Sequence, residues 1–145
     1  MLETMKSIAK ENSLCVLATV NEDAEPHCSL MAYAIDDACR ELYMATGKST
    51  QKYKNLQKNP TVSLLIDTRE MQFREQTRAL TISGVYQPIE NEKTKTQIRS
   101  KLLKQHPHLK DFFSHADIVF ICIKLRSFLL LNNVSESHYV EINDA

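Results

Sequence analysis

The chain has 145 residues with 18 basic and 18 acidic side chains, so its formal net charge at pH 7 is zero. This length predicts a single domain over residues 1–145 with a core of its own, and the even charge balance argues against a nucleic-acid-binding protein. No apolar run reaches the roughly 18 residues of a membrane span, and no signal peptide is visible, so we expect a cytoplasmic protein without a membrane partner.

The N-terminal third predicts one helix followed by three strands. The helix ends near Asn12, and its apolar face contains Leu2, Met5, Ile8 and Ala9. A nearly continuous apolar run over Leu14–Val20 predicts a buried strand, and the alternation over residues 26–35 predicts a second. Residues 42–46 form a third. Polar turns separate them, so we expect an antiparallel meander.

The stretch after the third strand predicts a tight turn and a short helix. Gly47 allows the positive φ that such a turn often needs, Ser49 or Thr50 can cap the helix, and Pro60 ends it. At a helix N-terminus, free N–H groups and the helix dipole favour an anion. We interpret the turn as a phosphate site; the alternative is a capped surface helix with a solvated lysine face. The side chains gathered there are Thr46, Lys48, Ser49, Thr50, Lys52 and Lys54.

The middle of the chain predicts two further strands. Thr61–Asp67 alternates apolar and polar residues, residues 68–77 are charged and predict a loop, and residues 78–89 predict a long strand. Gly84 interrupts that strand, which indicates a bulge or a close approach of another backbone segment.

The last third predicts helices and then strands. Residues 92–106 predict a helix with Asn91 as its N-cap, and residues 109–113 a short helix or turn. Residues 117–131 predict a long strand rich in Ile, Val and Phe, and residues 137–142 a last short one. Many antiparallel strands with few helices predict an α+β fold built on a closed or nearly closed barrel.

The cysteines and histidines give no metal site. Cys15, Cys28, Cys39 and Cys122 form no CxxC pair, and we expect buried free thiols in a reducing compartment. His106 and His108 flank a proline and predict a helix-ending loop. No Ser-His-Asp or Cys-His arrangement is readable, so the sequence assigns no catalytic side chain.

One motif resembles a known family. The pattern Thr50-x-Lys52-x-x-Asn55-Leu56-x-x-Asn59-Pro60-x-Val62-Ser63-Leu64 is similar to the flavin-binding segment of the pyridoxamine 5'-phosphate oxidase-like split barrels, and the resemblance extends over about residues 14–131. It implies an antiparallel split β-barrel with flanking helices. It also implies a homodimer that binds FMN at the subunit interface, and an FMN-dependent oxidoreductase acting on a small molecule, with a nicotinamide electron donor.

The same resemblance implies the contacts to the cofactor. Thr50 and Lys52 match the residues that hold the FMN phosphate. Gln51 stands where the family often has arginine, and Lys48 or Lys54 supplies the charge instead. The other matching positions are Leu30, Met31, Ala32 and Tyr33 along the flavin ring, Ala45 and Thr46 at the end of the third strand, and Gln76 and Arg78 across the dimer interface.

The chain also departs from the family pattern. The oxidases of this family bind the substrate phosphate with a C-terminal tryptophan and arginines, whereas this chain has no tryptophan and no arginine after Arg126. We therefore expect a substrate other than pyridoxamine phosphate. Two alternatives remain: a non-catalytic flavin-binding protein, or a haem-handling split barrel in which His27, His115 or His138 ligates iron.

Overall fold

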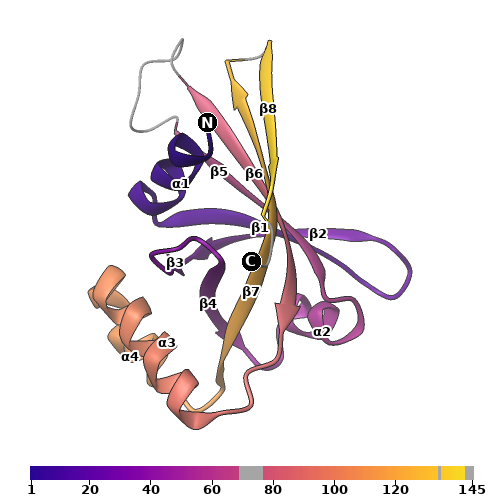
Figure 1. Ribbon diagram of the computed structural model, residues 1–145. Helices are drawn as coiled ribbons and strands as arrows, with labels where there is room; N and C mark the ends of the chain where they lie inside the picture. The colour runs from indigo at the N-terminus through magenta and orange to yellow at the C-terminus, as the bar shows by residue number, and fades with distance from the viewer. Residues whose placement is uncertain (69–76, 134, 143–145) are drawn as a thin grey trace.

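The computed structural model describes residues 1–68, 77–133 and 135–142 and is built around one curled antiparallel sheet (Figure 1). Along the sheet the strand order is β2-β1-β5-β6-β7-β4-β3, and β8 pairs with the free part of β7. The strands are β1 (Leu14–Val20), β2 (Pro26–Ala32), β3 (Ala34–Ile35), β4 (Glu41–Gly47), β5 (Thr61–Asp67), β6 (Arg78–Gln87), β7 (Ile118–Asn132) and β8 (Glu136–Glu141). The predicted α+β split barrel is confirmed.

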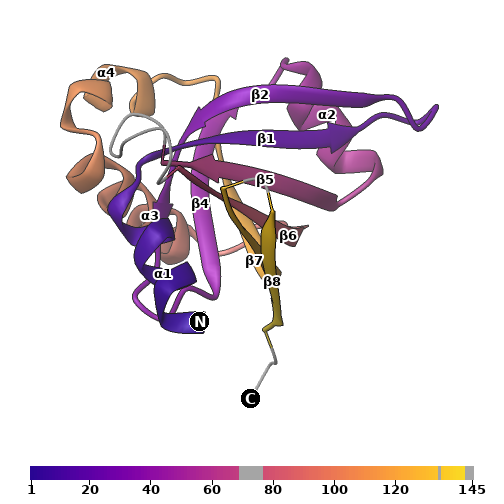
Figure 2. The ribbon, with the colours of Figure 1, turned by 90° about the horizontal axis from the view of Figure 1, so that it is seen from above.

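The barrel closes through a single residue. β2 and β3 lie at opposite ends of the strand order, yet only Tyr33 separates them in the chain. Met31 pairs with Cys15 of β1, whereas Ala34 pairs with Tyr43 of β4. The predicted strand over residues 26–35 is therefore two strands with different partners, and this change of partner curls the sheet, as Figure 2 shows from above.

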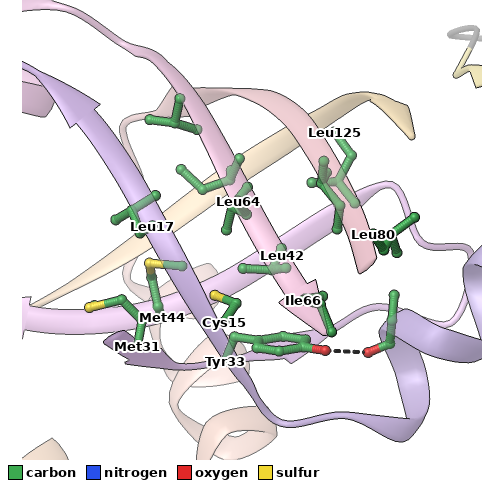
Figure 3. Packing of buried hydrophobic residues seen from close by; sticks show 14 of the residues in the cluster. Cys15, Leu17, Met31, Tyr33, Leu42, Met44, Leu64, Ile66, Leu80 and Leu125 are labelled. Carbon is green, nitrogen blue, oxygen red and sulfur yellow. Dashed lines mark hydrogen bonds between the residues drawn. The ribbon is translucent and has the colours of Figure 1, made fainter. Parts of the chain in front are cut away.

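The barrel interior holds the main core (Figure 3). Helix α1 (Leu2–Glu11) closes one end of it with Met5, Ile8 and Ala9. The Tyr33 hydroxyl, inside the barrel, donates a hydrogen bond of 2.6 Å to the Ala9 carbonyl and so fastens α1 to the sheet. Besides Tyr33, the largest fully buried side chains of the sheet are those of Phe128, Leu17, Leu42, Met44, Leu64, Ile66, Leu80 and Ile82.

A second layer covers the outside of β3, β4 and β7. It consists of α3 (Glu92–Gln105), the 3₁₀ turn η2 (Pro107–Leu109) and α4 (Lys110–Phe113). Asn91 caps α3 as predicted, because its side chain accepts a bond of 2.8 Å from the Lys93 N–H. The cluster between this layer and the sheet contains Ala34, Tyr43, Ala45, Ile98, Leu102, Phe113 and Cys122.

Gly84 marks the predicted irregularity in β6. The register of β6 and β7 shifts between Ser83 and Gly84, and Arg126 becomes the extra residue of β7. A Cβ at Gly84 would lie 2.6 Å from Ile123 Cγ2 and 2.8 Å from the Lys124 carbonyl oxygen. Only glycine fits there, because β7 passes directly against the Gly84 backbone.

The cysteine prediction is right for three residues and wrong for one. All four thiols are free, and Cys15, Cys39 and Cys122 are buried. Cys28 is exposed, because the alternation of β2 turns Met31 into the barrel and Cys28 outward. Among the helices that the structure describes, none is both long and apolar enough to cross a membrane.

Candidate functional site

The turn between β4 and α2 (Gln51–Lys58) is held by two threonine hydroxyls. Thr50 is the N-cap of α2, as the sequence predicted, and its Oγ1 accepts a bond of 3.4 Å from the Tyr53 N–H. The same hydroxyl donates its proton to the Gly47 carbonyl oxygen at 2.9 Å. The buried Thr46 hydroxyl lies 3.1 Å from Thr50 Oγ1 and must be the donor in that pair, since Thr50 has no second proton. In this conformation both hydroxyls shape the turn.

The donors that remain at this turn belong to the backbone of α2. The N–H groups of Gln51 and Lys52 are at the first two helical positions and have no acceptor within the helix. The first turn contains no acidic residue to offset the positive end of the helix dipole. Lys48 is exposed, Lys52 is half-buried, and neither forms an ion pair with a described residue. The turn is therefore an uncompensated positive site of the kind that binds phosphate.

Two polar residues of the motif anchor the helix. Asn55 is only 2 % exposed, and its Nδ2 donates a bond of 3.0 Å to the hydroxyl of Thr19, which is buried in β1. The Gln51 side chain points toward the C-terminus of α2, and its Nε2 donates a hydrogen bond of 2.7 Å to Asn55 Oδ1. It therefore lies away from the helix N-terminus. Sequence reasoning missed this chain of bonds, because a buried Thr19 is indistinguishable from any other alternating strand residue.

The residues predicted to lie along the flavin ring face in different directions. Leu30 points outward and is 72 % exposed, and Ala32 is half-buried on the same face of β2. Met31 and Tyr33 point into the barrel. The Tyr33 N–H donates 3.0 Å to the Ser13 carbonyl, and its own carbonyl lies 2.8 Å from His106 Nε2. Tyr33 therefore has no free polar group for a ligand. Ala45 is buried beneath α3.

Arg78 lies far from the α2 turn within one chain. It begins β6 opposite Asn132, and its N–H donates 2.8 Å to Thr68 Oγ1. The other end of β6 approaches α2, where the Tyr86 N–H donates to the Pro60 carbonyl. A strand of this length spans about 30 Å, so Arg78 lies about that far from the end of β6 that approaches α2. Gln76, its predicted companion, lies outside the described residues.

A row that is apolar except for one threonine crosses the outer face of the sheet. Its members are paired residue by residue across six strands, and we call them the outer ladder: Leu30, Val16, Leu65, Thr81, Leu129 and Tyr139. Leu65 and Leu129 are each 40 % exposed and Tyr139 is 59 % exposed. Leu14 and Leu131 extend the apolar surface on one side. In other proteins, large exposed apolar surfaces often mark interaction sites.

The buried thiols are not nucleophiles. Burial raises the pKa of Cys15 to about 12, and it also raises the pKa of Cys39 and Cys122. The Cys122 thiol donates to Glu41 Oε2 at 2.8 Å, and this carboxylate raises its pKa further. At neutral pH these groups stay protonated, so none supplies a thiolate.

The histidines are spread over the molecule. His106 is buried against Tyr33, as described, at the end of α3. His115 Nδ1 accepts the Asp117 N–H at 3.3 Å, and His138 Nε2 lies 2.9 Å from a Glu136 carboxylate oxygen. His27 is exposed on β2. Within the described ranges, no group of three or more His, Cys, Asp or Glu side chains could hold a metal ion.

Comparisons with known proteins agree with this architecture. The family model described as pyridoxamine 5'-phosphate oxidase matches residues 1–129. No curated relative matches the chain. Many solved structures are similar at low sequence identity.

Three of these structures represent the range. A haem-binding protein from Mycobacterium smegmatis is 16% identical, with a TM-score of 0.82 over 96% of this chain and 57% of its own. HutZ, the haem storage protein from Vibrio cholerae, is 18% identical, with a TM-score of 0.75 over 90% of this chain and 92% of its own. A Clostridium acetobutylicum protein related to general stress protein 26 is 13% identical, with a TM-score of 0.75 over 97% of this chain and 94% of its own. The chain thus spans little more than half of the first of these proteins, and these likenesses show the fold.

Proposed function

Because the chain belongs to the pyridoxamine 5'-phosphate oxidase family, we propose that it is an FMN-binding oxidoreductase that acts on a small molecule as a homodimer. One observation carries the proposal. The N-terminus of α2 presents the N–H groups of Gln51 and Lys52 without helical acceptors, lacks an acidic residue, and lies beside Lys48 and Lys52. A phosphate fits this donor set.

Each part of the turn has a defined task in this proposal. The Gln51 and Lys52 N–H groups donate to the phosphate, and the ammonium groups of Lys52 and Lys48 balance its charge. Thr50 and Thr46 hold the turn in shape through their bonds to Gly47 and to each other. The bound FMN supplies the redox chemistry at its ring, with a nicotinamide nucleotide as electron donor. The substrate differs from pyridoxamine phosphate, since the chain has no tryptophan and no arginine after Arg126.

The outer ladder supports the homodimer. It runs over six strands and so spans about 24 Å, comparable with the width of an interface that buries roughly 800 Å² on each partner. A two-fold interface uses the same patch on both copies, so the patch must be complementary to itself. An apolar face is complementary to its own copy because it needs no opposite charge on the other side. The arrangement also offers a reason for placing Arg78 in the site, since only the partner's Arg78 would reach the flavin. A cytoplasmic location belongs to the proposal as well, because the buried free thiols suit a reducing compartment.

A haem-handling protein is the second candidate, and the fold shared with the Mycobacterium smegmatis haem-binding protein and with HutZ favours it. Of the three histidines that could ligate iron, His115 and His138 already bond to Asp117 and Glu136. His27 is exposed, and its ring has no hydrogen bond to a described residue. A haem site would therefore involve His27. A flavin carrier without activity is the third candidate.

One preparation separates these candidates. We expect the native protein to release a compound with the mass of FMN and to show flavin absorption bands. We also expect the FMN-loaded protein to oxidise NADH or NADPH. If the native protein shows a Soret band and His27→Ala lacks it, the haem candidate is favoured over the proposal. Tight FMN binding without oxidation of either nucleotide would leave a flavin carrier, and failure to bind added FMN would refute the proposal.

A further inference from the structure

A polar pocket lies outside the barrel, on the side away from α2. It opens between the end of α1, the edge strand β3, the turn after β3 and the second half of α3, which lie side by side at the left of Figure 1. Its volume is about 390 Å³, which is within the usual range of small-molecule sites. The α2 turn contributes no residue to it.

Tyr33 holds the walls of this pocket in place. Its hydroxyl is bonded to Ala9 of α1 at 2.6 Å, and its carbonyl lies 2.8 Å from Nε2 of His106, the residue that caps α3. Its N–H is bonded to Ser13 at the start of β1. Both helices that border the pocket are therefore fastened to one buried residue of its floor, so the pocket is formed before any ligand arrives.

The floor also carries an open sheet edge. The Asp36 N–H donates a bond of 3.1 Å to the Glu41 carbonyl of β4. Antiparallel pairing alternates, so Ala34 also faces Tyr43, and the N–H and C=O of Ile35 point away from β4. They point along the edge that borders the pocket. The pocket thus has a backbone donor in addition to its side chains.

Basic groups dominate its walls. Lys10 from the last turn of α1 and Lys101 and Lys104 from α3 all line it. Asp36 and Asp37 line it too, but Asp36 Oδ1 already accepts the Arg40 and Glu41 N–H groups at 2.8 and 3.0 Å. The lining thus contains three lysines and two aspartates, and of these aspartates only Asp37 is exposed and without backbone partners among the described residues. The Lys101 ammonium also lies 5.0 Å from the centroid of the Tyr43 ring.

We propose that this pocket binds a small organic anion through a carboxylate or phosphate group. The anion lies between Lys10, Lys101 and Lys104, and the Ile35 N–H donates to it. The competing explanation is that Lys10 and Lys104 only offset the negative C-terminal ends of their helices. That explanation predicts lysines that affect stability and no ligand, whereas the pocket explanation predicts saturable binding. The site is independent of the flavin proposal.

Amide NMR of the ¹⁵N-labelled protein tests the proposal at low ionic strength, with inorganic phosphate and with citrate as probes. We expect saturable shifts of the Ile35 and Gln105 amides, and one of the two probes to bind more tightly, which identifies the favoured group. Shifts at Gln51 and Lys52 report the α2 turn separately. The double variant Lys101→Gln/Lys104→Gln should bind about tenfold more weakly, because two ammonium contacts are lost.

Two further variants make the test specific. Lys93→Gln removes one positive charge from the exposed first turn of α3, outside the pocket, and should leave the affinity within about twofold. Gln105→Trp keeps every charge, fills the pocket from an exposed position, and should abolish the shifts at Ile35. Unmoved Ile35 and Gln105 amides with both probes would overturn the proposal. Equal weakening by Lys93→Gln and by the double variant would also overturn it, since it would show general attraction to a basic helix.

Discussion

Replacing Lys52 by alanine tests the phosphate site at its single half-buried cation. The side chain lies beside two N–H donors that remain available in Lys52→Ala, so the change removes one charge-assisted contact and leaves the turn intact. Such a contact is worth about 1.5–3 kcal/mol, and partial exposure of Lys52 places it near the lower value. We therefore expect FMN affinity to fall about tenfold.

The assay is quenching of flavin fluorescence on titration with apoprotein, performed with FMN and with riboflavin. Riboflavin lacks the phosphate, so its affinity should be the same for the wild type and for Lys52→Ala. The ratio by which the wild type binds FMN more tightly than riboflavin should also shrink as the salt concentration rises, because salt screens the exposed part of the charge attraction. The control is Lys58→Ala at the far end of α2, where the lysine is 63 % exposed and 3.8 Å from Glu22. Equal FMN affinity for wild type and Lys52→Ala would refute the assignment and leave α2 as a capped surface helix.

Three other changes follow from the geometry. Gly84→Ala should lower the free energy of unfolding by about 1–3 kcal/mol in urea denaturation, because its Cβ would lie 2.8 Å from the Lys124 carbonyl; an unchanged midpoint would contradict the close approach. Leu129→Glu places a charge in the middle of the outer ladder and should convert a dimer to a monomer in sedimentation, whereas Glu136→Gln at the end of β8 should not; a wild-type monomer at micromolar concentration would rule out the interface. Burial raises the pKa of the Cys15 thiol from 9.0 to about 12, so the unfolded chain loses this proton at a lower pH than the folded chain, and the free energy of unfolding should decline from about pH 9 to about pH 12. Cys15→Ala should show a smaller decline over that range. An identical decline in Cys15→Ala would show that other groups cause it.

The local chemistry of the chain determined most of the elements. Apolar periodicity located the helices and strands, Asn91 and Thr50 marked two helix starts, and Gly84 marked the bulge. These features depend on neighbours within a few residues, so the sequence carries them directly. The motif that begins at Thr50 also located the turn that the structure presents as a positive site.

The same motif did not reveal which atoms are available for a ligand. The Thr50 hydroxyl is used within the turn, and Gln51 is bonded to Asn55, so the donors that remain are N–H groups that every helix start possesses. Whether the Thr50 hydroxyl stays free depends on its distance to the Gly47 carbonyl in the folded chain. Whether the Gln51 amide stays free depends on the position of Asn55, which is bonded to Thr19. Spacing along the sequence contains no such distance.

The tertiary structure alone decided how the sheet closes and what it exposes. Alternation over residues 26–35 gives the two faces of a strand, but the exchange of β1 for β4 as a partner at Tyr33 depends on residues distant in the chain. The register between successive strands likewise sets Leu30 in line with Leu129, four strands away. A strand's own sequence specifies which residues share a face, whereas its register against other strands is fixed only when the whole barrel packs.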